Sequence, residues 1–457
     1  MKIVKIIHGY PPAYNAGSEV YSQTLCHELA NSHEVHVFTR EENPFLPDYG
    51  LRREPDIYNP SVTKHMVNLP LLRQRYRYRH EAMDRIFETL LETIKPDIVH
   101  VGHLNHLSTS LLEKTKDKGI PIVFTLHDYW LICPRGQFIQ RNPDSNDDIW
   151  NSCDGQEDRK CAEKCYTGYF SGAHKEWEAD SDYWTDWVSR RQAHLRQIVN
   201  LVDKFIAPAQ YLLERFQKEL SIPASKLIYL DYGFDLSRLT DRYRQPEQDF
   251  VWGYIGTHTP QKGIHLLLKA FATLKGNSKL RIWGRSRSEV TPGLQQLASH
   301  LPADIQSRIE WLPEYSNPHI VGDVFNHVDA IVVPSIWVEN SPLVIHEAQQ
   351  VGVPVITANE GGMKEYVQHE VNGLLFDFRN ESSLAEQMQR FVDEPELATK
   401  LGKRGYLYSN DHNIPSIQDH VRKIEEVYLD LLLEKKGTAY DSPCNHDTET
   451  RPVANNL

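Results

Sequence analysis

Residues 334–352 have the sequence PSIWVENSPLVIHEAQQVG, which predicts a helix that starts shortly after a buried strand. The strand is the apolar run Ala330–Val333 just before it. Ser341 is a favoured N-cap residue and Pro342 suits the first helical position, so we expect the helix to begin at Ser341. Its free N–H groups would then lie at the carboxyl edge of the strand, where open α/β sheets bind anionic ligands.

Two carboxylates flank this expected helix start. Glu339 lies in the loop before it, and Glu347 lies on the helix, four residues after Leu343 and on the same face. Helix amides would bind an anion while the carboxylates accept hydrogen bonds from hydroxyl groups, which predicts a site for a phosphate-bearing polyol. An ordinary capped helix with a surface glutamate is the alternative that these residues leave open.

Apolar runs of strand length alternate with helical segments on both sides of this stretch, which is typical of parallel, doubly wound sheets. The expected strands are Ile3–His8, Glu34–Thr39, Asp97–Val101, Pro121–His127, Lys204–Ala207 and Leu227–Tyr232 in the first half, and Val251–Gly256, Leu280–Gly284, Ile309–Leu312, Ala330–Val333 and Val353–Ala358 in the second. The polar, unpatterned residues 232–249 form the best linker candidate. We therefore expect an α/β protein of two Rossmann-like, doubly wound domains, residues 1–234 and 235–412, facing across a cleft.

Three further segments lie outside these regular units. Residues 129–182 are too long for a plain connection, and we expect them to form an insertion in the first domain that shapes one rim of the cleft. Residues 413–436 should form a long amphipathic helix, from Asn413 to about Lys435. The polar residues 437–457 are expected to be disordered.

A short loop joins the first expected strand to the helix expected at Ser18–Asn31. Gly17 and Ser18 stand in this loop, where the backbone can approach a phosphate closely. The motif is shorter than a GxGxxG fingerprint, and no acidic ribose-binding residue follows at the expected place. A dinucleotide-binding domain of the usual kind is therefore disfavoured.

Composition and charge restrict the partners. The formal net charge of the 457 residues is −12, which argues against a broad nucleic-acid interface, so we expect no nucleic-acid partner. The apolar start MKIVKIIHGY is interrupted by Lys5 and His8, unlike a signal peptide, and no run of 18 apolar residues occurs. We expect a cytoplasmic protein, with peripheral contact at the inner face of the membrane as a further option.

Two clusters of side chains allow alternative interpretations. Four of the six cysteines, Cys133, Cys153, Cys161 and Cys165, fall inside the insertion, but only the spacing of the last two suits zinc, so we prefer free thiols to a zinc site. Residues 73–79 carry four arginines in alternation. We interpret them as a solvated basic face in preference to a binding site for acceptor phosphate or anionic lipid headgroups.

Five stretches together, in this order along the chain, resemble the retaining glycosyltransferases of family 4, which have the GT-B fold. They are YPPAYNAGSEVYSQTL, similar to the family's glycine loop with Ala16 at the second glycine; PDIVHVGHL and TLHDYWLICPRG, similar to acceptor-domain segments; GTHTPQKG, similar to the donor-phosphate motif; and the pair of carboxylates with the spacing E-x7-E. The resemblance covers nearly everything except the tail. It places the family's active-site histidine at His127 and its phosphate-binding lysine at Lys262.

This resemblance implies a nucleotide-sugar donor, with a UDP-hexose favoured, bound by the second domain, and a saccharide or lipid-linked acceptor bound by the first. It implies catalytic roles for His127, Glu339 and Lys262, and no metal ion or cofactor. Hydroxyl groups of the donor sugar would bind Glu339, and the ribose would bind Glu347. The residues expected at the donor are Gly17, Thr257, Lys262, Arg285, Leu312, Glu339, Asn340, Ser341, Pro342, Leu343 and Glu347.

One position departs from the family pattern. Thr257 stands where an arginine commonly helps to hold the donor diphosphate, and Arg285 or Arg287, just past an expected strand end, could replace its charge. Glu365, which follows two glycines, is expected to be structural. A catalytically silent scaffold of the same fold is the rival from another class, and a phosphorylase or sugar-nucleotide epimerase is the rival within the fold.

Overall fold

The computed structural model describes residues 1–70, 78–141, 150–167, 177–244 and 247–440. Its first domain is built on an eight-stranded sheet with the order β10-β9-β6-β5-β1-β2-β4-β3. All pairs are parallel except β3 with β4. The strands are β1 (Lys2–Ile6), β2 (Glu34–Glu41), β3 (Leu51–Pro55), β4 (Val62–Asn68), β5 (Ile98–Val101), β6 (Ile122–Thr125), β9 (Lys204–Ala207) and β10 (Leu227–Tyr229).

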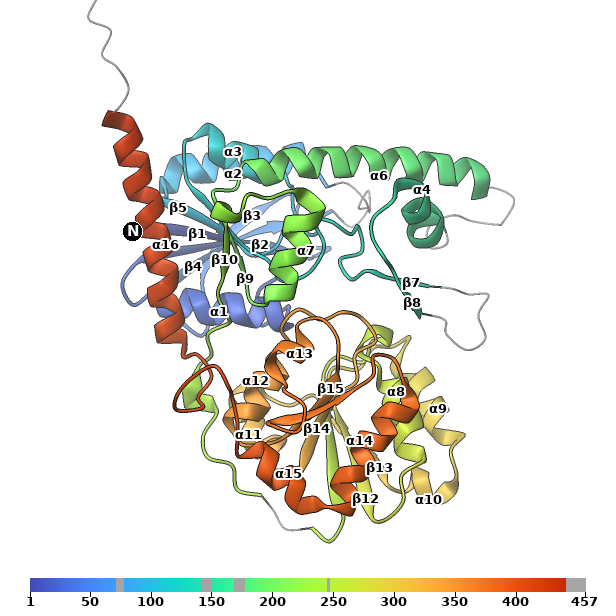
Figure 1. Ribbon diagram of the computed structural model, residues 1–457. Helices are drawn as coiled ribbons and strands as arrows, with labels where there is room; N and C mark the ends of the chain where they lie inside the picture. The colour runs from blue at the N-terminus through green and yellow to red at the C-terminus, as the bar shows by residue number, and fades with distance from the viewer. Residues whose placement is uncertain (71–77, 142–149, 168–176, 245–246, 441–457) are drawn as a thin grey trace, which may run out of the picture.

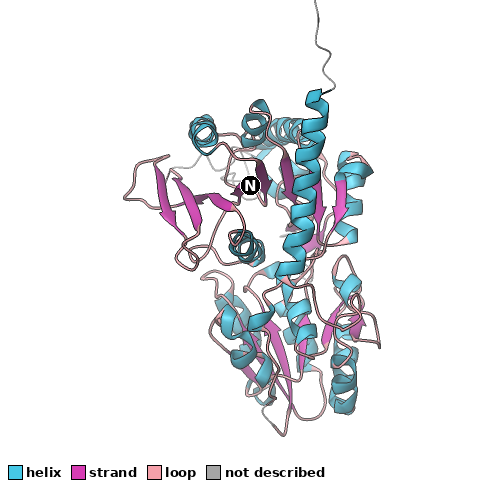
Figure 2. Cartoon of the chain, turned by 90° about the vertical axis from the view of Figure 1, so that its left-hand side faces the viewer, coloured by secondary structure: helices cyan, strands magenta, loops and turns pink. Residues whose placement is uncertain are grey.

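The second domain lies below the first in Figure 1 and contains a six-stranded, fully parallel sheet with the order β13-β12-β11-β14-β15-β16. Its strands are β11 (Phe250–Ile255), β12 (Ser278–Trp283), β13 (Ile309–Trp311), β14 (Ala330–Val333), β15 (Val355–Ala358) and β16 (Gly373–Phe376). The interiors of β11, β14 and β15 are buried. Figure 2 shows both sheets covered by helices, so the expected pair of doubly wound α/β domains is confirmed.

Helices connect the strands in both domains. In the first domain they are α1 (Gly17–Leu29), α2 (Glu81–Ile94), α3 (Leu111–Asp117), α6 (Trp177–Asn200) and α7 (Gln210–Leu220). In the second they are α8 (Ile264–Ala272), α9 (Thr291–Ser299), α10 (Ala303–Gln306), α11 (Ile320–Asp323), α12 (Leu343–Gln350), α13 (Met363–Tyr366), α14 (Glu381–Asp393) and α15 (Pro395–Gly402).

Three strands of the two domain sheets, β3, β4 and β16, were not predicted from the sequence. β3 and β4 lie within residues 44–79, where the sequence shows little periodicity, because β4 buries the polar side chains of Lys64 and His65. Lys64 Nζ lies 2.9 Å from a Glu54 carboxylate oxygen on β3, so the edge strand supplies a partner for the buried ammonium group. β16 is a short run after two turns and has no long apolar pattern of its own.

The insertion extends the first domain sideways (Figure 1). It includes the antiparallel pair β7 (Ile139–Arg141) and β8 (Trp150–Ser152), then α4 (Asp158–Cys161) and the π-helix η1 (Ala162–Thr167), both of which pack against α6. Arg379, from the loop after β16, donates hydrogen bonds to the carbonyls of Trp150 and Ile336. The insertion is therefore tied to the loop of the second domain that precedes α12.

The cysteines of the insertion are free thiols in the structure, and burial raises the pKa of Cys161 and of Cys165 to about 12. Within the described ranges, no group of three or more His, Cys, Asp or Glu side chains is arranged to hold a metal ion. Free thiols therefore stay our prediction for this cluster. Residues 73–77 of the arginine-rich segment and the tail from 441 lie outside the described residues; Arg79 donates to the Ser110 hydroxyl at 2.8 Å.

The long C-terminal helix α16 (Ile417–Tyr440) returns to the first domain and packs against α1 (Figures 1 and 2). It begins four residues later than expected. Tyr428 on α16 is hydrogen bonded through its hydroxyl to His100 Nδ1 at 2.5 Å, and His420 Nε2 is hydrogen bonded to the Tyr21 hydroxyl at 2.7 Å. The chain thus crosses between the domains twice. At these crossings Phe234 N–H donates to the Pro415 carbonyl and Ile417 N–H donates to the Phe234 carbonyl.

Ending the chain after Asn410 should destabilise the first domain as well as the second. The truncation removes Tyr428 and Ile424, which are fully buried against the first domain, and loss of a large buried side chain costs about 3–5 kcal/mol. Hydrogen exchange of amides in β1 and β5 should therefore accelerate in the truncated protein. Unchanged protection of those strands, in a truncated protein that still folds, would contradict the packing role of α16.

Acid should destabilise the protein through its buried histidines. Burial lowers the pKa of His65 and of His420 from 6.5 to about 4, and it also lowers the pKa of His8, His100 and His127 well below the usual value. Because the unfolded chain binds these protons first, the free energy of unfolding should fall as the pH drops from about 6.5 to about 4, by on the order of 3 kcal/mol for His420 alone. Denaturant unfolding at these pH values measures the loss. His420→Gln should flatten the profile, and His369→Gln, at an exposed site, should not.

Candidate active site

A cavity of about 430 Å³ lies between the two domains, beside the carboxyl ends of both sheets. From the first domain it is lined by the loop before α1 and the loops after β5 and β6. From the second domain it is lined by the loops after β11 and β12 and by the segment from Trp337 to Glu347. Ligand sites of this volume at strand ends are typical of open α/β sheets. The cavity brings together most of the residues predicted from the sequence.

Lys262 and Glu339 form an ion pair at this cavity. Lys262 ends the short 3₁₀-helix η5 (Pro260–Lys262) after β11, and its Nζ lies 2.6 Å from Glu339 Oε1. The same carboxylate oxygen accepts a hydrogen bond from the Ser335 hydroxyl at 2.7 Å. Glu339 is 3% exposed and Lys262 side-chain atoms are 33% exposed, so the ammonium group is the more accessible partner.

Gly263 allows Lys262 to reach this position. Its φ is +73°, and a Cβ atom there would lie 1.8 Å from the carbonyl oxygen of Pro334. A side chain would therefore push the lysine loop away from the loop that carries Glu339. The position of Lys262 at this site therefore requires the glycine that follows it.

The start of α12 differs from the sequence prediction. The helix begins at Leu343, Pro342 is its N-cap with extended backbone (ψ 116°), and the Ser341 hydroxyl has no partner in the structure. The reason is Asn340, whose Oδ1 accepts the Ser341 N–H at 2.7 Å and whose Nδ2 donates to the His127 carbonyl. These contacts hold the chain extended through Pro342. The predicted cap at Ser341 was therefore wrong, although Ser341 and Pro342 both line the cavity.

Gly17 lies opposite this helix start. A Cβ atom on Gly17 would lie 3.5 Å from Leu343 Cδ1, so the glycine loop of the first domain closely approaches α12 of the second domain. Both residues line the cavity. The structure thus brings the glycine loop close to the start of α12.

His127 lies on the wall formed by the first domain. Its Nδ1 is hydrogen bonded to the Tyr232 hydroxyl at 2.6 Å, and its Nε2 is buried without a partner in the structure. Burial lowers the pKa of His127 well below its usual value, helped by Lys5 and His103 nearby, so the imidazole is neutral at pH 7. The free nitrogen of a neutral imidazole can form a hydrogen bond with a hydroxyl group of a ligand.

Glu347 lies on the face of α12 that lines the cavity and pairs with a residue that the sequence did not suggest. Arg238 Nη2 lies 2.6 Å from Glu347 Oε1, and both side chains are largely buried. Arg238 belongs to the 3₁₀-turn η4 (Leu236–Arg238) in the predicted linker. The sequence did not indicate this role because Arg238 stands in a polar segment without periodicity, where no pattern marks a single buried arginine.

The other predicted donor residues are placed unequally. Thr257 and Arg285 line the cavity, and Arg285 Nε lies 3.2 Å from a Glu314 carboxylate oxygen. Leu312 packs against the core and is not among the residues that line the cavity, since its backbone N–H continues the sheet to the Ile282 carbonyl. Arg287 likewise does not line it; its N–H donates to the Thr291 hydroxyl in the turn before α9.

Asp231 is a further residue that the sequence did not suggest. Its carboxylate accepts hydrogen bonds from His346 Nε2 at 3.0 Å and from the Tyr406 hydroxyl at 2.7 Å, and both donors belong to the second domain. Burial alone would raise the pKa of Asp231, but these contacts hold it below its usual value. Asp231, at the first crossing between the domains, thus anchors α12 through His346, the residue that precedes Glu347.

Glu365 links the domains in a second way. Its carboxylate oxygens accept the N–H groups of Gln210 at 2.8 Å and of Tyr211 at 2.6 Å, which are the first residues of α7. A carboxylate at a helix N-terminus is a stabilising arrangement. Glu365 is therefore placed for the structural role expected of it.

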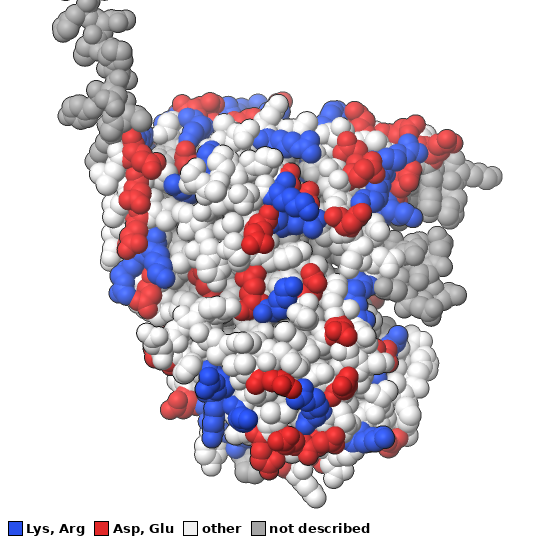
Figure 3. Space-filling view, viewed as in Figure 1, with Lys and Arg blue, Asp and Glu red and all other residues white. Residues whose placement is uncertain are grey.

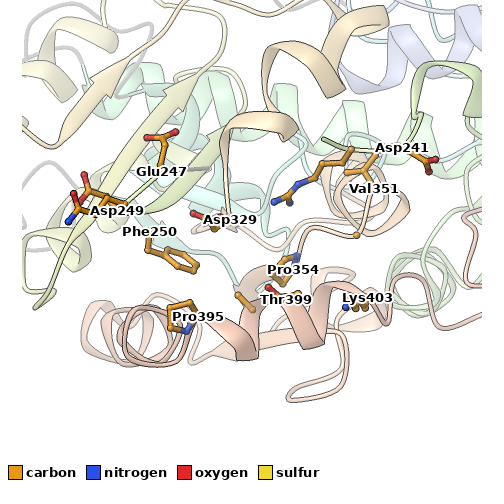
Figure 4. Close-up of a pocket in the computed structure, with 14 residues that line it drawn as sticks. Asp241, Glu247, Asp249, Phe250, Asp329, Val351, Pro354, Pro395, Thr399 and Lys403 are labelled. Carbon is orange, nitrogen blue, oxygen red and sulfur yellow. The ribbon is translucent and has the colours of Figure 1, made fainter. Parts of the chain in front are cut away.

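A second cavity, of about 570 Å³, lies near the amino ends of β11 and β15 in the second domain (Figure 4). Figure 4 shows α15 along one side, with Pro395 and Thr399 facing the opening. Two of its carboxylates are already paired: Asp329 accepts from Arg244 Nε at 2.7 Å, and Glu247 accepts from Arg281 at 2.8 Å. These pairs fasten the linker to the domain, so we assign this cavity no role in binding.

Family comparison agrees with this geometry. The model for Glycosyltransferase Family 4 matches residues 16–238, and the model for Glycosyl transferases group 1 matches residues 238–408. The two matches meet at Arg238, between the two sheets. The chain belongs to the family 4 glycosyltransferases. Within the described ranges of this glycosyltransferase, no helix has both the length and the apolar character needed to span a bilayer.

Curated relatives of the glycosyltransferase include the D-inositol 3-phosphate glycosyltransferase of Rhodococcus opacus (strain B4), 28% identical over 256 residues, which are 51% of this chain and 56% of the relative. They also include a GDP-mannose-dependent alpha-(1-6)-phosphatidylinositol monomannoside mannosyltransferase of Mycobacterium tuberculosis (strain H37Rv), 28% identical over 46% of this chain and 58% of the relative. The chain thus spans about half the length of the curated relatives it matches.

Solved structures similar to the glycosyltransferase show its fold. Sucrose-phosphate synthase from Thermosynechococcus elongatus is 18% identical with a TM-score of 0.63, over 96% of this chain and 100% of that chain. HepE from Anabaena, in complex with UDP and glucose, is 17% identical with a TM-score of 0.63, over 94% of this chain and 100% of that chain. These neighbours are GT-B glycosyltransferases, which confirms the predicted fold class.

Proposed function

We propose that this family 4 glycosyltransferase transfers a hexose from a nucleoside diphosphate sugar, with UDP-hexose favoured, to a hydroxyl group of a saccharide or lipid-linked acceptor. The observation that carries the proposal is the interdomain cavity in which Lys262, Glu339 and His127 converge. A silent scaffold would not need to preserve an accessible ammonium group, a buried carboxylate and a free imidazole nitrogen on opposite walls of one cavity.

The donor diphosphate would bind beside Lys262 and the glycine loop. Lys262 and Arg285 are the lysine and arginine side chains that line the cavity among the described residues. Their positive charge would oppose the negative charge that develops on the leaving diphosphate, together with the amide groups near Gly17 and the N-terminal end of α12. Arg285 is our candidate for the cation that Thr257 does not supply.

The donor sugar would bind between Glu339 and His127. Both Lys262 and Ser335 donate hydrogen bonds to one oxygen of Glu339, which suits a carboxylate that accepts from sugar hydroxyls better than one that attacks carbon. We therefore propose retention by attack from the leaving group's own face. The acceptor oxygen forms a bond to the anomeric carbon, the bond from that carbon to the phosphate oxygen breaks, and the departing phosphate takes the acceptor's proton.

Glu347 would accept hydrogen bonds from the donor ribose. Its pairing with Arg238 fixes the carboxylate within the cavity, and Asp231 fixes the preceding His346. Because Lys262, Arg285 and helix amides supply positive charge, we propose that no metal ion is required and that no cofactor is used beyond the nucleotide sugar. The enzyme would act in the cytoplasm, and its contact with the membrane would be peripheral, at the inner face of that membrane.

A thermal-shift screen of nucleotide sugars tests the donor. A ligand present at a hundred times its Kd should raise the free energy of unfolding by about 2.7 kcal/mol. We expect UDP-hexoses to stabilise the protein most. GDP-mannose is the donor in the name of one relative, and greater stabilisation by GDP-mannose would show that the donor's base is guanine instead of uracil. No stabilisation by any nucleoside diphosphate or its sugars would contradict the proposed function and favour the scaffold alternative.

A further inference from the structure

The acceptor side of the cavity carries two pairs of histidine and carboxylate that the donor site does not use. His8 Nε2 lies 3.3 Å from Glu19 Oε1, and His103 Nε2 lies 3.2 Å from Asp128 Oδ2. The rings of His8 and His103 pack together with their centroids 4.3 Å apart. All four residues line the cavity, on the wall that the first domain contributes.

Hydrogen bonds fix the protons on His103. Its Nδ1 accepts the Asn105 N–H at 2.9 Å, so its Nε2 carries the proton that it donates to Asp128. Asp128 also accepts the Trp130 N–H at 2.8 Å through its other oxygen. Its side chain is 30% exposed, so the carboxylate still has lone pairs that face the cavity.

The neighbouring pair offers a second set of acceptors. Glu19 is 5% exposed and also accepts the Ser18 hydroxyl hydrogen at 2.8 Å. Burial lowers the pKa of His8 well below its usual value, assisted by the nearby charge of Arg40, so His8 is neutral. With Nε2 donating to Glu19, its Nδ1 is an acceptor, and this nitrogen is buried without a partner in the structure. His127 Nε2 is a further buried nitrogen without a partner.

Positive charge is concentrated on the other wall. The described residues of the first domain that line the cavity include Glu19 and Asp128 but no lysine or arginine. Arg40 lies close by, and its guanidinium donates to the His8 carbonyl and to Glu42. Lys262 and Arg285 belong to the donor domain. An anionic group bound against the first domain would therefore meet two carboxylates and an excess of hydrogen-bond acceptors.

From this arrangement we propose that the acceptor presents an uncharged polyhydroxyl unit to the His8–Glu19 and His103–Asp128 wall, and that a phosphorylated sugar or polyol is rejected there. Hydroxyl groups can donate to carboxylates and to unprotonated ring nitrogens, whereas a phosphate has acceptors only and repels both carboxylates. The inference rests on the proposed function and narrows its acceptor to a neutral sugar, free or carried on a lipid.

The test compares matched ligand pairs by ligand-observed NMR titration of the full chain, without donor. The pairs are methyl α-D-glucoside with glucose 6-phosphate, methyl α-D-mannoside with mannose 6-phosphate, and myo-inositol with D-inositol 3-phosphate. We expect the neutral member of at least one pair to bind about tenfold more tightly than its phosphorylated partner, which corresponds to about 1.4 kcal/mol. Octyl α-D-glucoside below its micellar concentration distinguishes the sources, because tighter binding than the methyl glycoside indicates a lipid-linked acceptor.

Two variants connect the preference to the wall. Glu19→Gln combined with Asp128→Asn keeps the shapes and removes both charges, and should abolish the preference for the neutral member. Glu28→Gln, on the same helix as Glu19 but outside the cavity, should keep it. If the double variant does not fold, Asp128→Asn alone, at the more exposed position, should reduce the preference measurably.

Several results would overturn the inference. They are equal or tighter binding of the phosphorylated members, binding of no neutral member, or an unchanged preference in the folded double variant. UDP binding by the same samples is measured separately. A protein that binds no nucleoside diphosphate but prefers neutral polyols would contradict the proposed function, and only the selectivity of this wall for neutral polyols would stand.

Discussion

Lys262→Ala should lower turnover by about 100- to 1,000-fold, the range seen when a group that stabilises transition-state charge is removed. In the structure the Lys262 ammonium group is the partly exposed member of a 2.6 Å pair with Glu339, at the mouth of the predicted diphosphate site. Donor binding should weaken as well, because the diphosphate is charged before the reaction begins. Initial rates and calorimetric titration with the correct donor measure the two effects.

The matched control for this prediction is Lys269→Ala. Lys269 lies on the exposed side of α8, in the helix that follows Lys262, and should change neither rate nor donor binding. A Lys262→Ala enzyme that retained most of its turnover would show that Arg285, or another group, carries the diphosphate charge instead.

Glu339→Gln should lower turnover by roughly 10- to 100-fold, because a hydrogen bond to a charged group is worth about 1.5–3 kcal/mol. The substitution keeps the size of the side chain but removes the negative charge that orients Lys262 Nζ and accepts the Ser335 hydroxyl hydrogen. If Glu339 is a hydroxyl acceptor rather than a nucleophile, no sugar should be trapped on the protein during the reaction.

Intact-protein mass spectrometry during turnover checks the second part of that prediction. The expected mass is that of the unmodified chain for both the wild type and Glu339→Gln. A wild-type adduct of one hexose that disappears in the variant would instead identify Glu339 as a nucleophile. Glu396→Gln, an exposed carboxylate on α15, is the control and should behave as the wild type in both rate and mass.

The overall fold followed from the sequence because parallel strands buried on both faces are continuous apolar runs. Lys204–Ala207 and Ala330–Val333 have the predicted bounds. The failures are also physical. β4 hides Lys64 and His65 inside a sheet, which no apolar pattern can reveal. The start of α12 was misplaced because Asn340 contacts His127 from the other domain, so local cap preferences did not decide it.

The candidate site was predicted unequally for a similar reason. Residues at strand ends, such as Lys262 and Glu339, could be placed from the strand pattern and the family resemblance. Arg238 and Asp231 could not, because the partner of each lies more than 100 residues away in the sequence, Glu347 and His346 respectively. The buried pairings between domains are visible only once the two sheets are assembled.

Surface charge gives little further guidance to function. Figure 3 shows acidic and basic side chains interspersed on the face viewed, without a broad basic area. This agrees with the net charge of −12. The charged side chains that converge on one place are those of the interdomain cavity, among them Lys262 and Glu339.

The proposed mechanism is tested by the anomeric configuration of the product, determined by NMR after the reaction is run with the correct donor in excess EDTA. We expect full activity in EDTA and a product with the anomeric configuration of the donor sugar, because in the proposed mechanism Lys262, Arg285 and helix amides supply the positive charge and the acceptor attacks from the leaving group's face. An inverted product, or activity that returns only when a divalent metal ion is added, would contradict it.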